Sequence, residues 1–427
     1  VAQNTSSSLR VIVTDANGAA ASGVRVNVTH VPTGRSQVLA SNTQGIAATR
    51  GLAVGGPYEV SVVSGGEYAA DVIQNIYLEL DKTAVIDLAV RPVIEEIMVT
   101  AVAPTGEVAV GVGSAFDRST IDSTPSLSRD FISTLATDPK ILVDNSVARG
   151  PALSLAGGNF RYNSVTIDGV AQNDNFGLSK NASATQRTPI SIDAIEAVNV
   201  NIAPFDVTYG NFIGGNINIV TKSGTNDFEG SVYAFSTDDS LTGDESAGAD
   251  LAIQDFSEDY YGFTLGGPVI RDKLFFFVNY EKFETDRPSN TQTLNNIAGV
   301  TQADVDRVTN VLQTVYNFDP GEFDAIDTDE DEKILVKLDW YVNDDHRAAL
   351  TYQEADGDVI FDDFPEIAVL QSNRYNINEK LDAYSLQLFS NWTDNFSTEI
   401  KIGSKNVENR QISAVDPGTS ADFLITT

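Results

Sequence analysis

Hydrophobic and polar residues alternate with a period of two over most of this chain, the period of a strand with one apolar and one polar face. The clearest central runs are residues 197–202 (AVNVNI) and 216–221 (NINIVT), and the turn residues 223–226 follow the second run. Beyond that turn the strands become longer and richer in aromatic residues. The pattern therefore predicts a boundary between two architectures near residue 226.

Residues 1–91 predict a small immunoglobulin-like β-sandwich, because short strands alternate there with turns rich in Gly, Pro and Asn. Seven strands are expected at residues 9–14, 24–30, 35–40, 47–51, 58–63, 68–80 and 82–90.

Residues 105–225 predict a mixed α/β domain. Short helices are expected at residues 128–135 and 190–197, and strands at residues 164–168, 198–202 and 216–221. Gly157 and Gly158 do not form a nucleotide-binding loop, because no Gly-Lys-Ser/Thr sequence follows them and no βαβ unit surrounds them.

Residues 226–427 predict long strands with two different faces. Ile334, Val336 and Leu338 would lie on one face, and Lys333 and Lys337 on the other. A transmembrane β-barrel has this pattern, apolar toward lipid and polar toward the lumen, and a soluble antiparallel sheet shows the same alternation. Short turns alternating with long polar connections favour the barrel. Seven strands are expected near residues 228–237, 259–268, 272–285, 332–343, 346–356, 379–393 and 396–408.

Composition argues against catalysis and against nucleic-acid binding. The 427 residues include no cysteine and two separate histidines, His30 and His346, so they offer no thiolate site and no histidine-based catalytic group. No enzyme activity and no cofactor are predicted. The net charge is −33, and residues 227–427 contribute 40 acidic and 13 basic residues to it. Such a surface repels phosphate backbones, so no nucleic-acid partner is expected.

Acidic runs at residues 327–332 and 356–363 raise the question of calcium. The first run fails the EF-hand pattern, because Glu332 stands where Gly is required and Leu338 where Glu is required. Solvated acidic loops are the preferred interpretation, with calcium binding as the alternative, and no metal site is predicted.

Three stretches carry a family resemblance: residues 158–164 (GNFRYNS), 165–178 (VTIDGVAQNDNFGL) and 204–231 (PFDVTYGNFIGGNINIVTKSGTNDFEGS). They resemble the plug and the start of the barrel in TonB-dependent outer-membrane receptors of the Oar-like branch. Residues 1–91 resemble the carboxypeptidase regulatory-like domain, which is not catalytic. The resemblance implies a multi-domain, mainly β protein with a sandwich (1–91), a linker (92–104), a plug (105–225) and the first strands of a large transmembrane antiparallel barrel (226–427).

The linker contains a short β-prone run that resembles a TonB box. In that family such a segment offers its backbone to a sheet edge of the energy-transducing partner. A plain linker is the alternative. The predicted partner-binding residues are Ile94, Glu95, Glu96, Ile97, Met98, Val99, Thr100 and Ala101.

Two clusters rich in amides and aromatic residues flank the strand expected at residues 164–168. A hairpin-like return would bring both clusters to one end of the plug, where they could bind a polar polymer such as a peptide. The alternative is that they cap turns and pack against the barrel wall. The candidate ligand-binding residues are Phe160, Arg161, Tyr162, Asn163, Asn173, Asp174, Asn175 and Phe176. The resemblance also implies internal charge pairs at Arg129 and Arg149.

The resemblance implies energy-coupled uptake of an external ligand across the outer membrane of a Gram-negative bacterium, with the N-terminal domain in the periplasm. The expected partners are the TonB-type inner-membrane complex, outer-membrane lipid and a peptide or protein ligand. The alternative is a structural, scaffolding or adhesion protein that docks other outer-membrane, surface or secreted proteins without transport.

The strand count predicts that the barrel continues beyond this chain. A plug of ~120 residues has a radius near ~17 Å, whereas eight strands enclose a radius of about 8 Å and 22 strands one of about 22 Å. Seven strands, an odd number, would also leave two open edges in lipid. A barrel of about 22 strands is therefore expected, with roughly 15 strands outside the present sequence.

Overall fold

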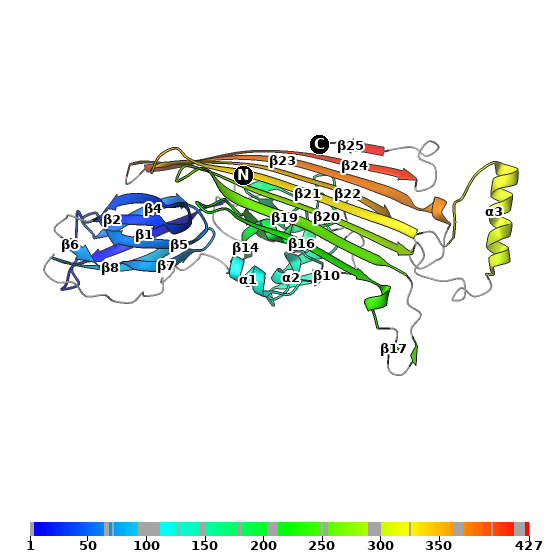
Figure 1. The fold of residues 1–427 in the computed structure, drawn as a ribbon, viewed down its shortest axis with the longest axis horizontal. Helices are drawn as coiled ribbons and strands as arrows, with labels where there is room; N and C mark the ends of the chain where they lie inside the picture. The colour runs from blue at the N-terminus through cyan, green and yellow to red at the C-terminus, as the bar shows by residue number, and fades with distance from the viewer. Residues whose placement is uncertain are drawn as a thin grey trace.

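The computed structural model contains a β-sandwich, a mixed domain and a long curved antiparallel sheet, arranged in that order along the chain (Figure 1). The structure describes residues 4–63, 68–70, 72–92, 112–126, 128–145, 150–177, 179, 181–202, 212–243, 245–246, 249–250, 255–288, 300–323, 326–361, 370–393, 396–413 and 423–426. The candidate TonB box, Ile94 to Ala101, and Arg149 lie outside these residues.

The N-terminal domain packs two four-stranded sheets face to face, with strand orders β4-β1-β8-β6 and β3-β2-β5-β7. Alternate residues of each strand point into one apolar core that includes Leu9, Val11 and Val60, all fully buried. The elements are β1 (Ser7–Thr14), β2 (Arg25–His30), η1 (Val31–Thr33), β3 (Arg35–Ala40), β4 (Ile46–Leu52), β5 (Gly55–Val62), β6 (Tyr68–Ala70), β7 (Ile73–Leu78) and β8 (Thr83–Pro92). The predicted sandwich is confirmed.

One predicted strand of the sandwich is wrong. Residues 68–80 form two strands, β6 and β7, which belong to opposite sheets. β6 pairs with β8, and β7 pairs with β5. A chain that crosses from one sheet to the other cannot remain one straight strand, and periodicity alone does not reveal the crossing.

The second domain, referred to here as the plug, is built on a five-stranded sheet of order β13-β12-β15-β14-β9. Val198 and Val200 of β14 and Ile217 and Ile219 of β15 face an apolar core that also includes residues of α1 and α2. The elements are β9 (Val112–Phe116), α1 (Arg118–Ser123), α2 (Ile132–Leu135), β10 (Ile141–Asp144), β11 (Ala152–Leu155), η2 (Phe160–Tyr162), β12 (Ser164–Ile167), β13 (Val170–Ala171), η3 (Ile192–Ala194), β14 (Ile195–Ile202) and β15 (Gly215–Thr221).

The helix predictions in the plug are largely wrong. Residues 190–197 form only the short η3 before β14 begins, because β14 pairs with β15 on one side and β9 on the other. The helix predicted at 128–135 shrinks to α2, since Arg129 has a left-handed backbone (φ 50°) that a helix cannot include. Helix α1 was not predicted, although Asp117 caps it by accepting a hydrogen bond from the Thr120 amide.

The third part is an eight-stranded sheet in which each strand pairs antiparallel with the next. The seven predicted strands are present, and most run a few residues further than expected. The sheet contains β16 (Glu229–Asp238), β19 (Ser257–Ile270), β20 (Leu274–Pro288), β21 (Ile326–Tyr341), β22 (His346–Phe361), β23 (Tyr375–Thr393), β24 (Phe396–Ser413) and β25 (Phe423–Thr426). This sheet is called the wall below.

The two faces of the wall have opposite polarity. Lys333, Lys337 and Asp339 of β21 are buried on the face that covers the plug. Trp340, on the opposite face of the same strand, is 52% exposed. The other large apolar side chains exposed along the wall include Leu338, Leu350, Tyr384, Trp392, Ile400 and Ile402. The predicted face assignment, apolar outside and polar inside, is confirmed.

Short turns lie at one end of the wall and long connections at the other (Figure 1). The longer connections contain η4 (Asp239–Leu241), the β17 (Glu245–Ser246) and β18 (Ala249–Asp250) pair, α3 (Gln302–Tyr316) and η6 (Gln371–Asn373). Helix α3, which was not predicted, begins with a capping box of Thr301 and Asp304 that is visible in the sequence. No helix in the described parts of the chain is both long and apolar enough to span a membrane.

The environment of His30, at the end of β2, predicts a pH dependence of the N-terminal domain. The His30 ring lies 4.6 Å from the Tyr58 ring, and Nδ1 lies 2.8 Å from the Thr33 hydroxyl. Burial, with the nearby Arg347 cation, lowers the pKa of His30 to about 4. The unfolded chain therefore binds this proton near pH 6.5 and the folded chain only near pH 4, so stability falls as the pH falls through that window.

We expect the N-terminal domain to lose about 2 kcal/mol of unfolding free energy between pH 7 and pH 5 through His30. Urea unfolding at the two pH values measures this loss. The His30→Gln variant should remove most of the pH dependence, and His346→Gln is the matched control. An unchanged pH dependence in His30→Gln would contradict the assignment.

Candidate functional site

The two candidate ligand clusters of the sequence lie together at one end of the plug. The short β12–β13 hairpin reverses the chain between them. The Asn173 Nδ2 atom donates to the carbonyl of Asn163 at 2.9 Å, and the Val165 amide donates to Asn173 Oδ1 at 2.9 Å. A further isolated bridge joins Asn173 to Ser183. The expected return of the chain is therefore present.

This end of the plug points toward the long connections of the wall. The Gln186 amide donates to Glu379 near the long-connection end of β23. At the opposite end of the plug, Asp168 lies 3.7 Å from Lys337 Nζ, and its carbonyl accepts from Gln387 at 2.8 Å. We call the end formed by residues 159–163 and 173–177 the apex.

Three of the eight candidate residues serve the plug's own backbone. Asn163 is 4% exposed; its Nδ2 atom donates to the Leu153 carbonyl at 2.7 Å, and its Oδ1 atom accepts from the Gly215 amide at 3.2 Å. Asn173 joins the two clusters, as described above. Asp174 accepts from the amides of Phe176 and Ser179 at 2.9 and 2.7 Å. These contacts fit the turn-capping alternative.

Four other candidates form an exposed surface. Tyr162 and Phe176 are 49% and 47% exposed, and Asn175 and Arg161 are also exposed. The Arg161 guanidinium donates to the carbonyls of Gly177 and Ser179 at 3.2 and 3.0 Å, so it also fixes the second cluster against the first. Phe160 is half-buried, with the Arg161 guanidinium 5.8 Å from its ring centre. The apex thus presents two aromatic side chains and one amide on a fixed loop.

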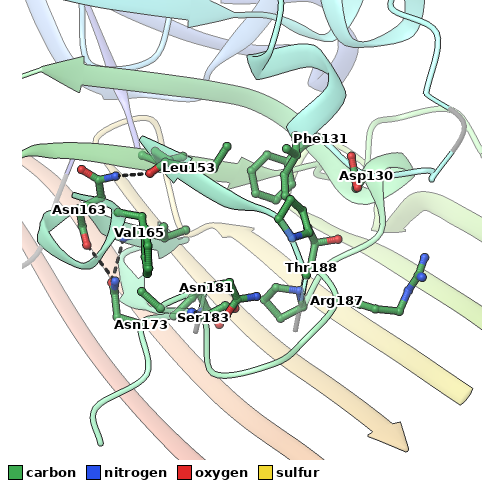
Figure 2. A pocket seen from close by; sticks show the side chains of 18 of the residues that line it. Asp130, Phe131, Leu153, Asn163, Val165, Asn173, Asn181, Ser183, Arg187 and Thr188 are labelled. Atoms are coloured by element: carbon green, nitrogen blue, oxygen red, sulfur yellow. Dashed lines mark hydrogen bonds between the residues drawn. The ribbon is translucent and has the colours of Figure 1, made fainter. Parts of the chain in front are cut away.

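A cavity of about 250 Å³ lies beneath the apex, and Figure 2 shows its walls. Phe131, Leu153 and Val165 contribute apolar surface, together with Ile217 and Ile219 of β15. Polar groups line the rest, namely Asp130, Asn163, Asn173, Asn181, Ser183, Arg187 and Thr188. No pattern in the sequence indicates this cavity, because its walls come from segments between residues 128 and 219 that only the folded plug brings together.

A buried charge network fixes the plug to the wall. Arg129 pairs with Asp193 of the plug and lies 3.5 Å from Glu281 of β20. Although burial acts to lower it, the carboxylates of Asp193 and Glu281 raise the pKa of Arg129 above its ordinary value. The guanidinium also lies over the Tyr233 ring, 4.0 Å from its centre. The charge pair expected at Arg129 is therefore present.

Arg187 makes the second charged contact of the plug with the wall. It donates to the Tyr260 hydroxyl at 2.8 Å, approaches Asp331 at 3.4 Å and lies 3.7 Å from the centre of the Phe283 ring. Lys333 of β21 lies between the two acids, 3.3 Å from Glu281 and 2.8 Å from Asp331. Buried charges are tolerated only when they are paired, so this network defines one position of the plug.

Comparison with solved structures shows that the fold occurs in known outer-membrane receptors. The fold is similar to the outer membrane transporter YddB of Escherichia coli, with a TM-score of 0.52 and 12% identity over 74% of this chain and 42% of that one. It is equally similar to the ferric enterobactin receptor PfeA of Pseudomonas aeruginosa, with a TM-score of 0.52 and 14% identity over 74% of this chain and 44% of that one. The chain thus spans less than half the length of these receptors.

Two family descriptions match parts of the chain. Residues 8–91 match the family described as "Carboxypeptidase regulatory-like domain", and residues 220–325 match the "Outer membrane beta barrel domain". With the fold, these matches make the chain similar to the TonB-dependent outer-membrane transporters of Gram-negative bacteria. Within this class the chain is Oar-like. It is 32% identical over 210 residues to the TonB-dependent transporter Oar of Myxococcus xanthus, a match that covers 46% of this chain and 18% of Oar.

Substitutions of the exposed apex residues should change ligand binding without changing the stability of the protein. We expect Asn175→Ala and Phe176→Ala to weaken ligand binding by about 1–3 kcal/mol each, because both side chains are exposed. Their unfolding temperatures should match that of the parent protein. Binding of a labelled peptide mixture to the receptor in outer-membrane vesicles measures the first effect.

The control is Asn163→Ala, which removes two contacts inside the plug and should lower its stability by about 1–3 kcal/mol. Arg161→Ala should affect both properties, because the guanidinium holds the second cluster in place. If the Asn175 and Phe176 variants lose stability without losing affinity, the apex is scaffolding.

Proposed function

We propose that this protein imports an external ligand across the outer membrane by energy-coupled remodelling of its plug. The observation that carries this proposal is the plug itself, a folded domain that lies against the polar inner face of a membrane wall and is fixed there by buried ion pairs. A domain in that position blocks passage, so import requires it to move.

The contacts between plug and wall are suited to such movement. Away from the charge network they include hydrogen bonds, such as those that Thr351 and Ser385 donate to the Asp168 carboxylate and carbonyl, each at 2.8 Å. Lys405 donates to the Asn173 carbonyl at 2.6 Å. Each such bond contributes only about 0.5–1.5 kcal/mol net, because water can replace the lost partner. These bonds can be exchanged for water, and movement of the plug would also separate Phe277 and Leu335 of the wall from the plug's apolar core.

The ligand class that fits the apex is a peptide or protein. Tyr162 and Phe176 offer large contact areas, and Asn175 offers one donor group and one acceptor group. This combination suits a polar chain with apolar side chains. The similarity to YddB and PfeA concerns the fold, and the ligand of this protein is inferred from its own apex.

The energy source is assigned to the TonB-type inner-membrane complex. Residues 94–101 lie between the end of β8 at Pro92 and the start of β9 at Val112. An extended segment there can add a strand to a partner's sheet, and main-chain hydrogen bonds then transmit the pull to the plug. The plug's first strand, β9, pairs at the edge of the sheet with β14, which makes it the first strand to receive the load.

Ile97→Pro tests this proposal. Proline removes one backbone donor and fixes φ, so it disrupts an added strand. We expect energy-dependent uptake of a labelled peptide mixture to fall at least tenfold, while membrane insertion and surface binding of the peptides persist. The matched control is Gly106→Pro, just beyond the end of the linker at residue 104 and outside the candidate segment.

Two results would count against the proposal. If Ile97→Pro and the parent protein take up the mixture at the same rate in energised cells, residues 94–101 are not the coupling segment. If the parent protein binds the peptides but uptake shows no dependence on the energy-transducing complex, a docking or scaffolding function replaces import.

A further inference from the structure

The N-terminal sandwich is docked against the plug at the short-turn end of the wall (Figure 1). Two buried asparagines of the plug sheet reach its backbone: Asn199 Nδ2 donates to the Leu80 carbonyl at 3.0 Å, and Asn218 Nδ2 donates to the Asn4 carbonyl. The Leu80 side chain, 1% exposed, packs against Ala197 and Val220 on the same sheet. The sandwich therefore covers part of the plug face opposite the plug's apolar core.

The sandwich also contacts the turns of the wall on one side. Arg35 forms an ion pair with Asp344 in the turn after β21 and donates to the Asp272 carbonyl at 3.2 Å in the turn after β19. The Asn226 amide donates to the Pro32 carbonyl at 2.8 Å. At Gly34, which has a φ of +64°, a Cβ atom would lie 2.7 Å from the side-chain oxygen Oδ1 of Asp272, so the sandwich and this turn are in close contact.

A second set of contacts joins the sandwich to strands β22 and β23. Arg347 donates to the Gly51 carbonyl at 3.2 Å, and Thr5 donates to the Gln387 side chain. A Cβ atom built on Gly51 would lie 3.2 Å from the Cβ atom of Phe389. The sandwich is thus held by the plug and by two separate parts of the wall.

A cavity of about 570 Å³ lies where the three domains meet. Its lining comes from the sandwich (including Thr33 and Pro57), the plug (including Asp168 and Glu196) and the wall (including Lys337). The cavity lies at the end of the plug opposite the apex, which is where a ligand that had passed the plug would emerge. The sandwich stands across that path.

The direction of β8 determines how a pull on the linker would act on this joint. β8 begins at Thr83, beside Leu80 in the joint, and runs for ten residues to Pro92. A ten-residue strand extends about 33 Å, so the linker starts at the end of the sandwich that is far from the plug. A pull on the linker therefore tilts the sandwich away from the plug and breaks its polar contacts one after another.

We propose that the N-terminal sandwich is a detachable lid over the exit of the plug, held by polar contacts and released when the linker is pulled. This inference rests on the proposed function, since it assigns a gate to the same transport path. In the docked state the lid closes the cavity and hinders passage. In the released state the joint, including Leu80 and Gly51, is open to solvent.

The first test measures the opening of the joint by chemical labelling. The chain has no native cysteine, so Leu80→Cys places a single thiol in the closed joint. With the labelled peptide mixture present, N-ethylmaleimide should modify this thiol at least five times faster in energised cells than in cells lacking the energy-transducing complex. The matched control is Tyr77→Cys, which replaces a residue of the sandwich that is 59% exposed, and its labelling should be equal in both.

The second test locks the lid to the wall without touching the plug. Cysteines at Gly51 and Phe389 would have Cβ atoms 3.2 Å apart, slightly closer than the roughly 3.5–4.5 Å of disulfides, so a small backbone shift would allow the bond to form in the oxidising periplasm. The Gly51→Cys, Phe389→Cys double variant should bind the peptide mixture normally but take it up at least tenfold more slowly. Dithiothreitol should restore uptake, and each single-cysteine variant should import at the parent rate.

The outcomes separate the lid from the transport function. If the parent protein shows energy-dependent uptake while Leu80→Cys labelling is the same with and without energy, the lid proposal is wrong and the function stands. A locked protein that imports at the parent rate would contradict the lid in the same way. If the parent protein shows no energy-dependent uptake, the proposed function fails first. The Leu80→Cys test is independent of the double variant, so it remains valid even if the double variant does not fold.

Discussion

The structure depends on one constraint, which is that each strand of the wall has an apolar face outward and a polar face inward. On β21, Leu338 and Trp340 face outward. Lys337 and Asp339, which alternate with them along the strand, are buried on the face that covers the plug. A period-two strand cannot present apolar residues on both faces and still carry these charges. A domain on the inner side of the wall must therefore contact these charged side chains.

The plug satisfies this constraint by giving its sheet two different faces. Val198 and Ile217 face an apolar core within the plug, and Asn199 and Asn218 face outward. Charges buried between plug and wall are paired: Lys333 lies between Glu281 and Asp331, Arg129 and Arg187 approach the same two acids, and Lys337 lies beside Asp168. An unpaired charge there would cost several kcal/mol, so pairing fixes the plug in one register rather than adding much stability.

The sequence predicts the fold well because the strands of the wall and of the plug sheet show the same period-two alternation of apolar and polar residues. The seven long wall strands and the strands at residues 164–168 and 216–221 follow from alternation alone. Alternation failed where tertiary pairing decides the structure. Residues 190–197 carry a helical pattern, yet β14 begins within them because two neighbouring strands pair with it. The crossing between β6 and β7 is likewise a property of two sheets, not of the local sequence.

The candidate site was predictable in position but not in detail. The two clusters around β12 were expected to meet, and they do. Their individual roles were not predictable, since Asn163 and Asn175 are the same residue type but one is 4% exposed and the other is on the surface. Which of these two side-chain amides donates to a backbone carbonyl depends on the tertiary structure of the plug. The cavity beneath the apex was missed for the same reason, because its lining is assembled from distant segments.

The same polarity rule explains why the three domains can be both well fixed and separable. Asn199 and Asn218 use the plug's polar face to hold the sandwich, and Asp168 on that face meets Thr351 and Ser385 of the wall. Hydrogen bonds of this kind are specific in geometry but exchange readily for water. An apolar joint would hold through buried area and would expose that area on opening. The apolar part of the joint is limited to Leu80 against Ala197 and Val220, so the sandwich can detach from this face of the sheet while the other face keeps the plug folded through its apolar core.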